Sequence, residues 1–404
     1  MSNTADQTRP WQGPALFTYG FRPFFLGAGL WAGLAMAVWI GMLAGLFALP
    51  TGFDPISWHA HEFLYGYLGA VIAGFLLTAV PNWTGRPPIM GWPLVGLFSL
   101  WMLGRIAIAV SQMLSPILVA AADLALPVVL SLVIAREIIA GRNWRNLGVL
   151  VLLGIFTLGN AMFHCEAARH EFAAQGQGLR TGVAAVIMLI ALIGGRIIPA
   201  FTKNWLTRNR PGRMPTPPEQ GFDRIALAVL LAAVLAWIAA PSSRLTALAL
   251  AAAGVLHLLR LVRWAGDRTL SEPLVWVLHL AYAFLPVGAL VMAVSAVAPA
   301  LATNAAGQHL WMAGCIAMMT IAVMTRATRG HTGHELAADR ATMALYLALF
   351  AAVMLRFASG MIPQWGPALH DLAGIAWIAG FARFCLRYGP MLTNRREDRG
   401  PLNR

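Results

Sequence analysis

Long apolar stretches separated by short polar connections run along almost the whole chain. There are twelve of them, at residues 21–48, 58–80, 93–112, 116–137, 147–167, 180–200, 223–240, 245–264, 272–295, 308–326, 340–359 and 368–388. A helix needs about 20 apolar residues to cross the hydrocarbon core of a bilayer. The runs are continuous rather than alternating, which excludes a transmembrane barrel. The pattern predicts an all-α polytopic membrane protein with about 12 transmembrane helices.

The longest polar break is rich in proline and arginine and covers residues 203–221. It divides the chain into two six-helix halves, at about 15–202 and 222–390, without a residue-level repeat between them. We expect one integral membrane domain over residues 1–404.

Composition agrees with this interpretation. The chain is 59% hydrophobic and only 11% charged, whereas soluble domains carry about 25% charged residues. The net charge of +13 comes from arginines scattered along the chain, so we expect no nucleic-acid partner. The three cysteines lie far apart and form no Cys-x-x-Cys motif, which excludes a c-type haem attachment.

The Lys and Arg residues predict the orientation. The two ends and every second connection hold 23 of them, the other connections hold three, and three lie inside apolar segments. Cytoplasmic loops of membrane proteins carry the excess of Lys and Arg. Both termini are therefore predicted to be cytoplasmic.

This topology sorts the ten histidines by depth. Six fall near the outer face: His59, His61, His164, His170, His309 and His370. The other four fall deeper or on the cytoplasmic side: His257, His279, His331 and His334. A histidine inside a membrane is costly and usually has a partner, and neutral imidazole is the commonest metal ligand. We interpret His170, His257, His334 and His370 as interfacial polar residues, and the other six as candidate haem or metal ligands.

The segment Trp58–Glu62 places two imidazoles and a carboxylate at the mouth of an apolar run. In a helix, His59 and His61 would point about 200° apart and could not share one metal; in an extended entry they would lie on one side. Asp54 and Pro55 favour a helix that begins near this point, so we expect His59 in a non-helical lead and His61 in the first turn.

Three polar residues are expected to support these histidines. Glu62 can orient an imidazole N–H, as carboxylates near metal sites do. Tyr65 follows His61 by four residues, and Asn160 precedes His164 by four, so each pair shares one helical face. We expect hydrogen bonding or proton delivery from Glu62, Tyr65 and Asn160.

Of the three arginines within apolar segments, Arg105 and Arg196 each follow a glycine. Because the spans offer few acids as counter-charges, each could meet a haem propionate. The alternative is that the side chain snorkels to the headgroups.

Several phrases of the sequence together resemble the NnrS family, which are bacterial inner-membrane proteins associated with haem, copper and the nitric oxide response. The likeness runs from Phe17 to about Arg387. The phrases are Phe21–Phe25, Trp58–Glu62, Gly74–Gly85, Gly195–Thr202, Leu278–His279 and Val323–Thr328 running into Gly330–Gly333. Arg329 stands where an apolar residue is expected.

The resemblance implies haem b, one or two per chain, with copper as a further option. The motif histidines carried over are His59, His61, His164, His279, His309 and His331, and the motif arginines are Arg22, Arg196 and Arg326. Together with Arg105, these arginines would bind propionates or serve the structure. The resemblance also implies a multi-pass protein of the bacterial cytoplasmic membrane.

Two hypotheses of function remain open. In the first, which we favour, the protein is an enzyme that decomposes or reduces nitric oxide at a haem and receives electrons from an unknown donor. His59, His61, His164 and His309 would then build the outer centre, and His279 and His331 could ligate a second, inner haem. In the second, it is a non-catalytic haem- or metal-dependent sensor or transporter of nitric oxide.

Overall fold

A computed structural model describes residues 11–395, and these residues form helices, turns and loops without any strand. Twelve helices in this part of the chain are long and apolar enough to cross a membrane, which confirms the predicted number and the fold class. Arg9, Arg396, Arg399 and Arg404, which contribute to the predicted charge bias, lie outside the described residues.

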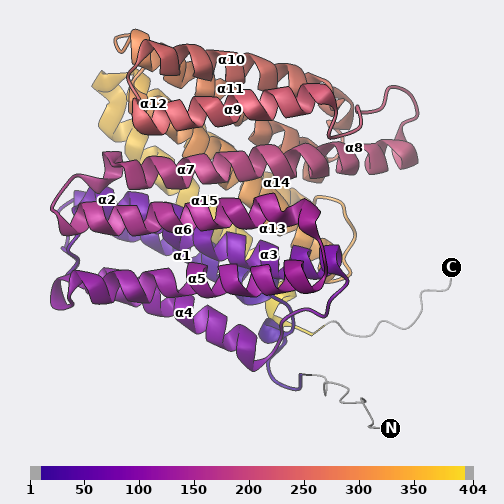
Figure 1. Ribbon diagram of the computed structural model, residues 1–404, viewed down its shortest axis with the longest axis horizontal. Helices are drawn as coiled ribbons and strands as arrows, with labels where there is room; N and C mark the ends of the chain where they lie inside the picture. Colours follow the sequence, from indigo (N-terminus) through magenta and orange to yellow (C-terminus); the bar gives the residue numbers. More distant parts are fainter. Residues whose placement is uncertain (1–10, 396–404) are drawn as a thin grey trace.

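The helices follow one another through short connections (Figure 1). The bounds are α1 Phe21–Leu43, α2 Pro55–His61, α3 Leu68–Thr84, α4 Trp92–Ala109, α5 Pro116–Ala140, α6 Leu147–Ala168, α7 Gln177–Leu189, α8 Gly195–Asn209, α9 Gly221–Ala239, α10 Arg244–Val262, α11 Pro273–Val297, α12 Asn304–His309, α13 Met318–His331, α14 Arg340–Met361 and α15 Gly366–Thr393. Short 3-10 turns lie at Ala15–Phe17, Ser111–Met113, Trp144–Asn146, Ala173–Gln175, Gly266–Thr269 and Pro363–Trp365.

Three spans are each built from two α-helices joined by a π-helical stretch. These stretches are Glu62–Tyr67 between α2 and α3, Ile190–Gly194 between α7 and α8, and Leu310–Ala317 between α12 and α13. In each of these spans 72% of the most apolar window is buried inside the protein, against 28–50% in the other nine. The second, sixth and tenth spans are therefore the centre of the bundle, and π-helical turns occur frequently at functional sites.

The other nine spans pack around this centre in three groups of three. The helices α4, α5 and α6 pack between α3 and α7, so that α3 contacts α5 and α6 contacts α7. In the same way α9, α10 and α11 pack between α7 and the tenth span. The third group is α14, α15 and α1, which pack between the tenth span and α3. Figure 1 shows the first two groups on opposite sides of α7. Each group encloses, with two central spans, one set of polar side chains, which include Asp123 in the first group, His257 in the second and Arg356 in the third.

The second and tenth spans share one plan. In both, a short helix ends at a histidine, His61 or His309, and the π-helical stretch begins at the next residue. Each span then ends at a Thr-Gly pair, Thr84 with Gly85 and Thr332 with Gly333. The likeness recurs after eight spans rather than six, so it does not follow the division into halves.

Helix α8 continues beyond the predicted start of the polar break at residue 203 and ends at Asn209. Proline disfavours helical backbone in the preceding residue, and Arg210, which precedes Pro211, is indeed extended. The break in helical structure therefore begins at Arg210. The helical backbone is continuous at two glycine- or proline-containing positions, since Gly194 lies in a π-helical stretch and α11 runs through Pro286.

The two ends of the described chain meet. The side chain of Arg395 donates hydrogen bonds to the carbonyls of Trp11 and Gly13 at 3.2 and 2.8 Å. Arg22 is buried beneath them and donates to the last carbonyls of α15, at Leu392 and Asn394. An even number of spans requires the ends to lie on one side, and this arrangement agrees with it.

Candidate cofactor and metal sites

Helix α2 brings the Trp58–Glu62 cluster into the bundle. Asp54 caps the helix by accepting the backbone N–H groups of Ile56 and Ser57, both at 3.0 Å, and Pro55 occupies the first turn. Both His59 and His61 lie within the helix, so the prediction of a non-helical lead at His59 is wrong. Residues two apart on a helix point about 200° from each other, and the two imidazoles accordingly enter different clusters.

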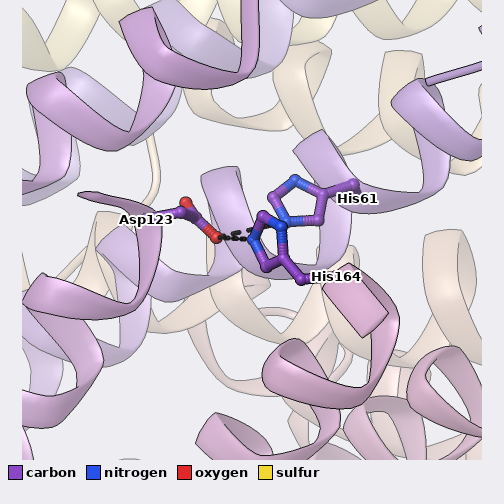
Figure 2. A group of neighbouring side chains, drawn as sticks. All are labelled: His61, Asp123 and His164. Carbon is purple, nitrogen blue, oxygen red and sulfur yellow. Dashed lines mark hydrogen bonds and ion pairs between the residues drawn. The ribbon is translucent and has the colours of Figure 1, made fainter. Parts of the chain in front are cut away.

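His61 is completely buried among polar side chains from three helices. Its Nδ1 lies 3.1 Å from Glu62 Oε1. Its Nε2 lies 3.1 Å from Asn160 Oδ1 and 3.2 Å from Asp123 Oδ2. Figure 2 shows the imidazoles of His61 and His164 beside the carboxylate of Asp123.

Asp123 is the centre of this cluster. Its Oδ2 lies 3.0 Å from His164 Nε2 and accepts a hydrogen bond from Asn160 Nδ2 at 2.8 Å. Arg105 on α4 bridges the two acids, with Nη1 at 2.5 Å from Glu62 Oε1 and Nη2 on Asp123 Oδ1. Arg105 is only 3% exposed. A propionate is therefore not needed as its counter-charge, which corrects the expectation that the spans lack acids for it.

The ring of Tyr65 packs against this cluster, but its hydroxyl forms a hydrogen bond outside it. Its hydroxyl donates to the carbonyl of Gly178 at 2.8 Å, and its ring centroid lies 5.4 Å from that of His61. Tyr65 therefore ties the second span to the sixth and lines the wall beside His61.

The opposite face of α2 opens on a cavity of about 740 Å³ between α1, the second and tenth spans, α14 and α15. Its walls are apolar apart from a few side chains, among them His59, His309, His370 and Arg356. His59 stacks on Trp39, with ring centroids 3.8 Å apart, and His370 packs edge-on against the same indole.

Several polar atoms around this cavity lack a partner. His59 Nδ1, Trp39 Nε1 and Arg356 Nε are buried without a hydrogen bond in the structure. His309 differs, because its Nδ1 lies 2.7 Å from the carbonyl of Ala305. A carbonyl only accepts, so Nδ1 carries the proton and Nε2 keeps its lone pair. Fixing the tautomer by a hydrogen bond from the other nitrogen is typical of metal-binding histidines.

The two inner candidates have different neighbours. The hydroxyl of Thr202 lies 2.8 Å from His279 Nε2, and Gly266 packs so closely that an added Cβ would lie 2.5 Å from His279 Nδ1. His331 lies at the exposed end of α13 and packs on the ring of Phe21 at 5.4 Å. Thus the six predicted histidines fall into separate places: His59 with His309, His61 with His164, His279 alone at Thr202, and His331 at the inner surface.

The remaining predicted arginines have protein partners. Arg196 pairs with Glu219 at 2.9 Å and donates to Asn146 Oδ1 at 3.2 Å. The hydrogen bond from Arg145 is the main reason that the pKa of Glu219 lies below its ordinary value. Arg326 lies over the ring of Phe201, 4.1 Å from its centroid. Like Arg22, these arginines serve the packing of helix ends.

Three residues of these clusters were not found by sequence reasoning: Asp123, Arg356 and His370. Asp123 stands inside α5, in a stretch of mean hydropathy 2.6, and an ionisable residue at that depth is itself a signal of function. Arg356 is likewise an ionisable residue inside an apolar span, α14. His370, read as interfacial, lines the cavity.

Comparison with known families finds one match. The model of the family described as NnrS protein matches residues 15–396, nearly the whole chain. A search of curated proteins finds no match.

Proposed function

The chain belongs to the NnrS family, and from this premise we propose that it is a haem-containing protein of the bacterial cytoplasmic membrane that binds nitric oxide and decomposes or reduces it. Family membership supports involvement in the nitric oxide response. Conversion of nitric oxide would protect the cell against nitrosative stress. Twelve spans put the protein in a lipid bilayer.

The observation that supports the haem is the cavity on the His59 face of α2. Its walls are mostly apolar with a few placed polar groups, as the walls of cofactor pockets are. His309 presents an unprotonated Nε2, and His59 has a buried nitrogen without a partner. The donor set therefore fits a haem b.

We assign His309 and His59 as the haem ligands and Arg356 as the partner of a propionate. Arg356 has a buried Nε without a hydrogen bond, and a carboxylate is the anion that a guanidinium binds best. The haem would supply an iron that could bind nitric oxide in place of one of these two histidines. His370, which packs edge-on against Trp39 and lines the same cavity, is the alternative ligand to His59.

The protein's own contribution is an apolar enclosure. Phe63, Leu64 and Trp377 line the cavity and exclude water. A second cavity of about 650 Å³ lies among the three central spans, shares Leu68 with the first, and has Thr320 as its one polar side chain. Nitric oxide partitions into apolar surroundings, so this second cavity gives it a path from the bilayer.

We propose one haem per chain. The inner histidines do not share a comparable enclosure: the ring of His279 is closed in by Gly266, and His331 lies at the surface. Electrons must come from a donor outside the described residues.

The experiment is spectroscopy of the purified full-length protein with iron analysis. We expect one haem b per chain, a shift of the reduced spectrum on addition of nitric oxide, and loss of the haem in His309→Ala. His170→Asn is the matched control, because His170 is exposed in a loop with φ 59°, a conformation that Asn tolerates. Stoichiometric binding of nitric oxide without consumption by the reduced protein would favour the sensor or transporter over the enzyme. A protein without iron would overturn the haem.

A further inference from the structure

Tyr282 on α11 and His257 on α10 form a buried hydrogen-bonded pair. The hydroxyl of Tyr282 lies 2.7 Å from His257 Nδ1, and both residues are completely buried. This burial corrects the expectation that His257 lies at the membrane interface. The pair belongs to the compartment enclosed by α9, α10 and α11, and neither residue lines the cavity beside His59.

The direction of this hydrogen bond follows from the other partners of the two side chains. His257 Nε2 lies 3.2 Å from the carbonyl of Ala226, and a carbonyl only accepts, so Nε2 carries the proton. Arg260 Nη1 donates to the Tyr282 hydroxyl at 2.9 Å, and the hydroxyl has one hydrogen of its own. The phenol therefore donates to the lone pair of His257 Nδ1. A doubly protonated His257 would leave the phenolic hydrogen without an acceptor and would bury a second cation beside Arg260.

This arrangement distinguishes Tyr282 from the other buried tyrosines. Their hydroxyls pair with a carbonyl or a threonine oxygen, which are much weaker bases than an imidazole: Tyr65 with Gly178, Tyr67 with Thr320, Tyr346 with Thr325 and Tyr388 with Thr342. A base within about 2.6–3.2 Å of the proton that it takes is the geometry that proton transfer requires. Tyr282 has such a base in His257.

A base beside a buried phenol makes the phenol easier to oxidise. Loss of an electron alone would bury a charged phenol cation, which is costly, and that cation is a strong acid. Transfer of its proton to an imidazole places the charge on a group that carries it readily. The charge of Arg260 does not oppose this step alone, because Arg260 Nε donates to the carboxylate of Asp223 at 2.7 Å.

The ring of Tyr282 lies directly behind the wall of the second cavity, the one among the three central spans. Gly194 lines that cavity, and a Cβ added at Gly194 would lie 3.6 Å from Cδ2 of the Tyr282 ring. With only a glycine between them, a small apolar molecule in the cavity comes close enough to the ring to exchange an electron. Trp264, which is 2% exposed, packs edge-on against the same ring with centroids 4.6 Å apart and keeps water from it.

We propose that Tyr282 and His257 form a redox site that gives one electron to a small radical oxidant in the second cavity, namely nitrogen dioxide, which forms from nitric oxide and oxygen. The O–H bond of Tyr282 breaks, the proton passes to His257 Nδ1, and the electron passes to nitrogen dioxide, which becomes nitrite. Tyr282 is left as a neutral phenoxyl radical and His257 as an imidazolium, so atoms and charge balance. Arg260 is a positioning residue that holds the phenol oxygen. The choice of oxidant rests on the proposed role in nitric oxide chemistry, whereas the site does not depend on the haem.

The test is pulse radiolysis of the full-length protein in detergent, with nitrogen dioxide generated from nitrite as the probe. All variants carry Tyr19→Phe, because Tyr19 is exposed and would react directly. We expect the absorption of a phenoxyl radical and, in samples frozen after the pulse, the EPR spectrum of a tyrosyl radical. Tyr282→Phe should lose both signals. Tyr346→Phe is the matched control and should keep them, because Tyr346 is buried as well but pairs with a threonine.

Two further variants separate the redox chemistry from packing and from the haem. His257→Gln keeps a side-chain acceptor for the phenol but removes the base, and its radical should form at least about 100-fold more slowly, the lower end of what a positioned base contributes. A purely structural role of His257 would leave this rate unchanged. His309→Ala, which should lack haem, should form the radical as wild type does, so the test stands even if the haem proposal fails. Equal radical yields in wild type and Tyr282→Phe, an unchanged rate in His257→Gln, or a wild type without a tyrosyl radical would each overturn the redox site.

Discussion

His59 and His61 are two residues apart on α2 and belong to different side-chain clusters. The ring of His59 stacks on Trp39 with centroids 3.8 Å apart, beside the large cavity. The ring of His61 lies on the other side of the helix, with Nε2 at 3.2 Å from Asp123. One helical turn thus presents an imidazole to each of two neighbouring compartments of the bundle.

This separation predicts independent energetic effects. In a double-mutant cycle, His59→Ala and His61→Ala should add to within about 0.5 kcal/mol of unfolding free energy, because residues without shared partners are additive. The pair His61→Ala and Asp123→Ala should instead show a coupling of about 0.5–3 kcal/mol, since they share a network. Denaturant unfolding in detergent measures both cycles. A coupling between His59 and His61 as large as that between His61 and Asp123 would contradict two separate clusters.

Arg105→Met should be strongly destabilising. The substitution removes the cation between Glu62 and Asp123 and leaves two buried carboxylates without it. Breaking a buried ion pair by removing one partner costs about 3–5 kcal/mol. The matched control is Arg213→Met, whose pair with Asp267 is 54% and 65% exposed and should cost at most about 1 kcal/mol. Similar midpoints of thermal unfolding for the two variants would show that the cluster carries little of the stability.

The sequence predicted the spans well because each is a long apolar run, and such runs have few alternatives in a bilayer. It also placed His59, His61, His164 and His309 in the same end of the bundle, since depth follows from the topology. The sequence also indicated that His59 and His61 would enter different clusters, because residues two apart on a helix point about 200° from each other.

The polar clusters and the π-helical stretches leave no comparable pattern in the sequence. Asp123 is a single acid in an apolar run. Nothing in the residues next to it in the sequence shows that it meets Arg105, because the two residues lie on different spans, α5 and α4, which come together only in the folded bundle. The π-helical stretches depend on tertiary contacts rather than local propensity; one example is Arg260 on α10, which donates to the carbonyl of Ala191 at 2.8 Å. Arg356 and His370 come together only when α14 and α15 close against α1.

Gly178→Ala should loosen the contact between α6 and α7. A Cβ at Gly178 would lie 2.4 Å from the backbone nitrogen of Phe163, and backbone cannot move aside cheaply. Overpacking of this kind costs about 1–3 kcal/mol, and the shift would also disturb the hydrogen bond from Tyr65. Gly154→Ala on α6 is the control: its Cβ meets nothing within 4 Å, and it should stabilise by about 0.5–1 kcal/mol through helix propensity. Thermal unfolding should shift in opposite directions for the two variants.

Asp339 predicts a pH dependence at the start of α14. Burial raises the pKa of its carboxyl, but hydrogen bonds from Thr342 and Arg387 outweigh this and bring the pKa below its ordinary value. The contribution to stability is therefore complete above the unfolded pKa of about 3.9 and is lost as the pH falls below it. Asn caps a helix as well as Asp, so Asp339→Asn should be less stable than wild type at neutral pH, and the difference should begin to shrink below about pH 3.9 and go on shrinking as the pH falls toward the lower folded-state pKa. Arg387→Gln should weaken the same dependence; a stability difference constant over this range would contradict it.

The predicted orientation can be tested with a cysteine that the chain already carries. Cys165 lies in the last turn of α6 and is exposed, beside the polar side chains of Glu166, Arg169 and Arg180. The charge bias places this end of α6 outside, because Lys and Arg are concentrated in the opposite connections. A membrane-impermeant maleimide should therefore label wild type in intact spheroplasts and should not label Cys165→Ser.

The buried thiol of Cys315 and the half-buried thiol of Cys385 lie within spans and should stay unlabelled. The matched control is Met214→Cys in the Cys165→Ser background, because Met214 is exposed in the basic connection after α8. This variant should react only after the membrane is permeabilised. Labelling of Met214→Cys in intact spheroplasts, with Cys165 protected, would reverse the topology. It would then put the haem cavity at the cytoplasmic face, where the donor of electrons to the haem would have to be a soluble partner or a cytoplasmic domain.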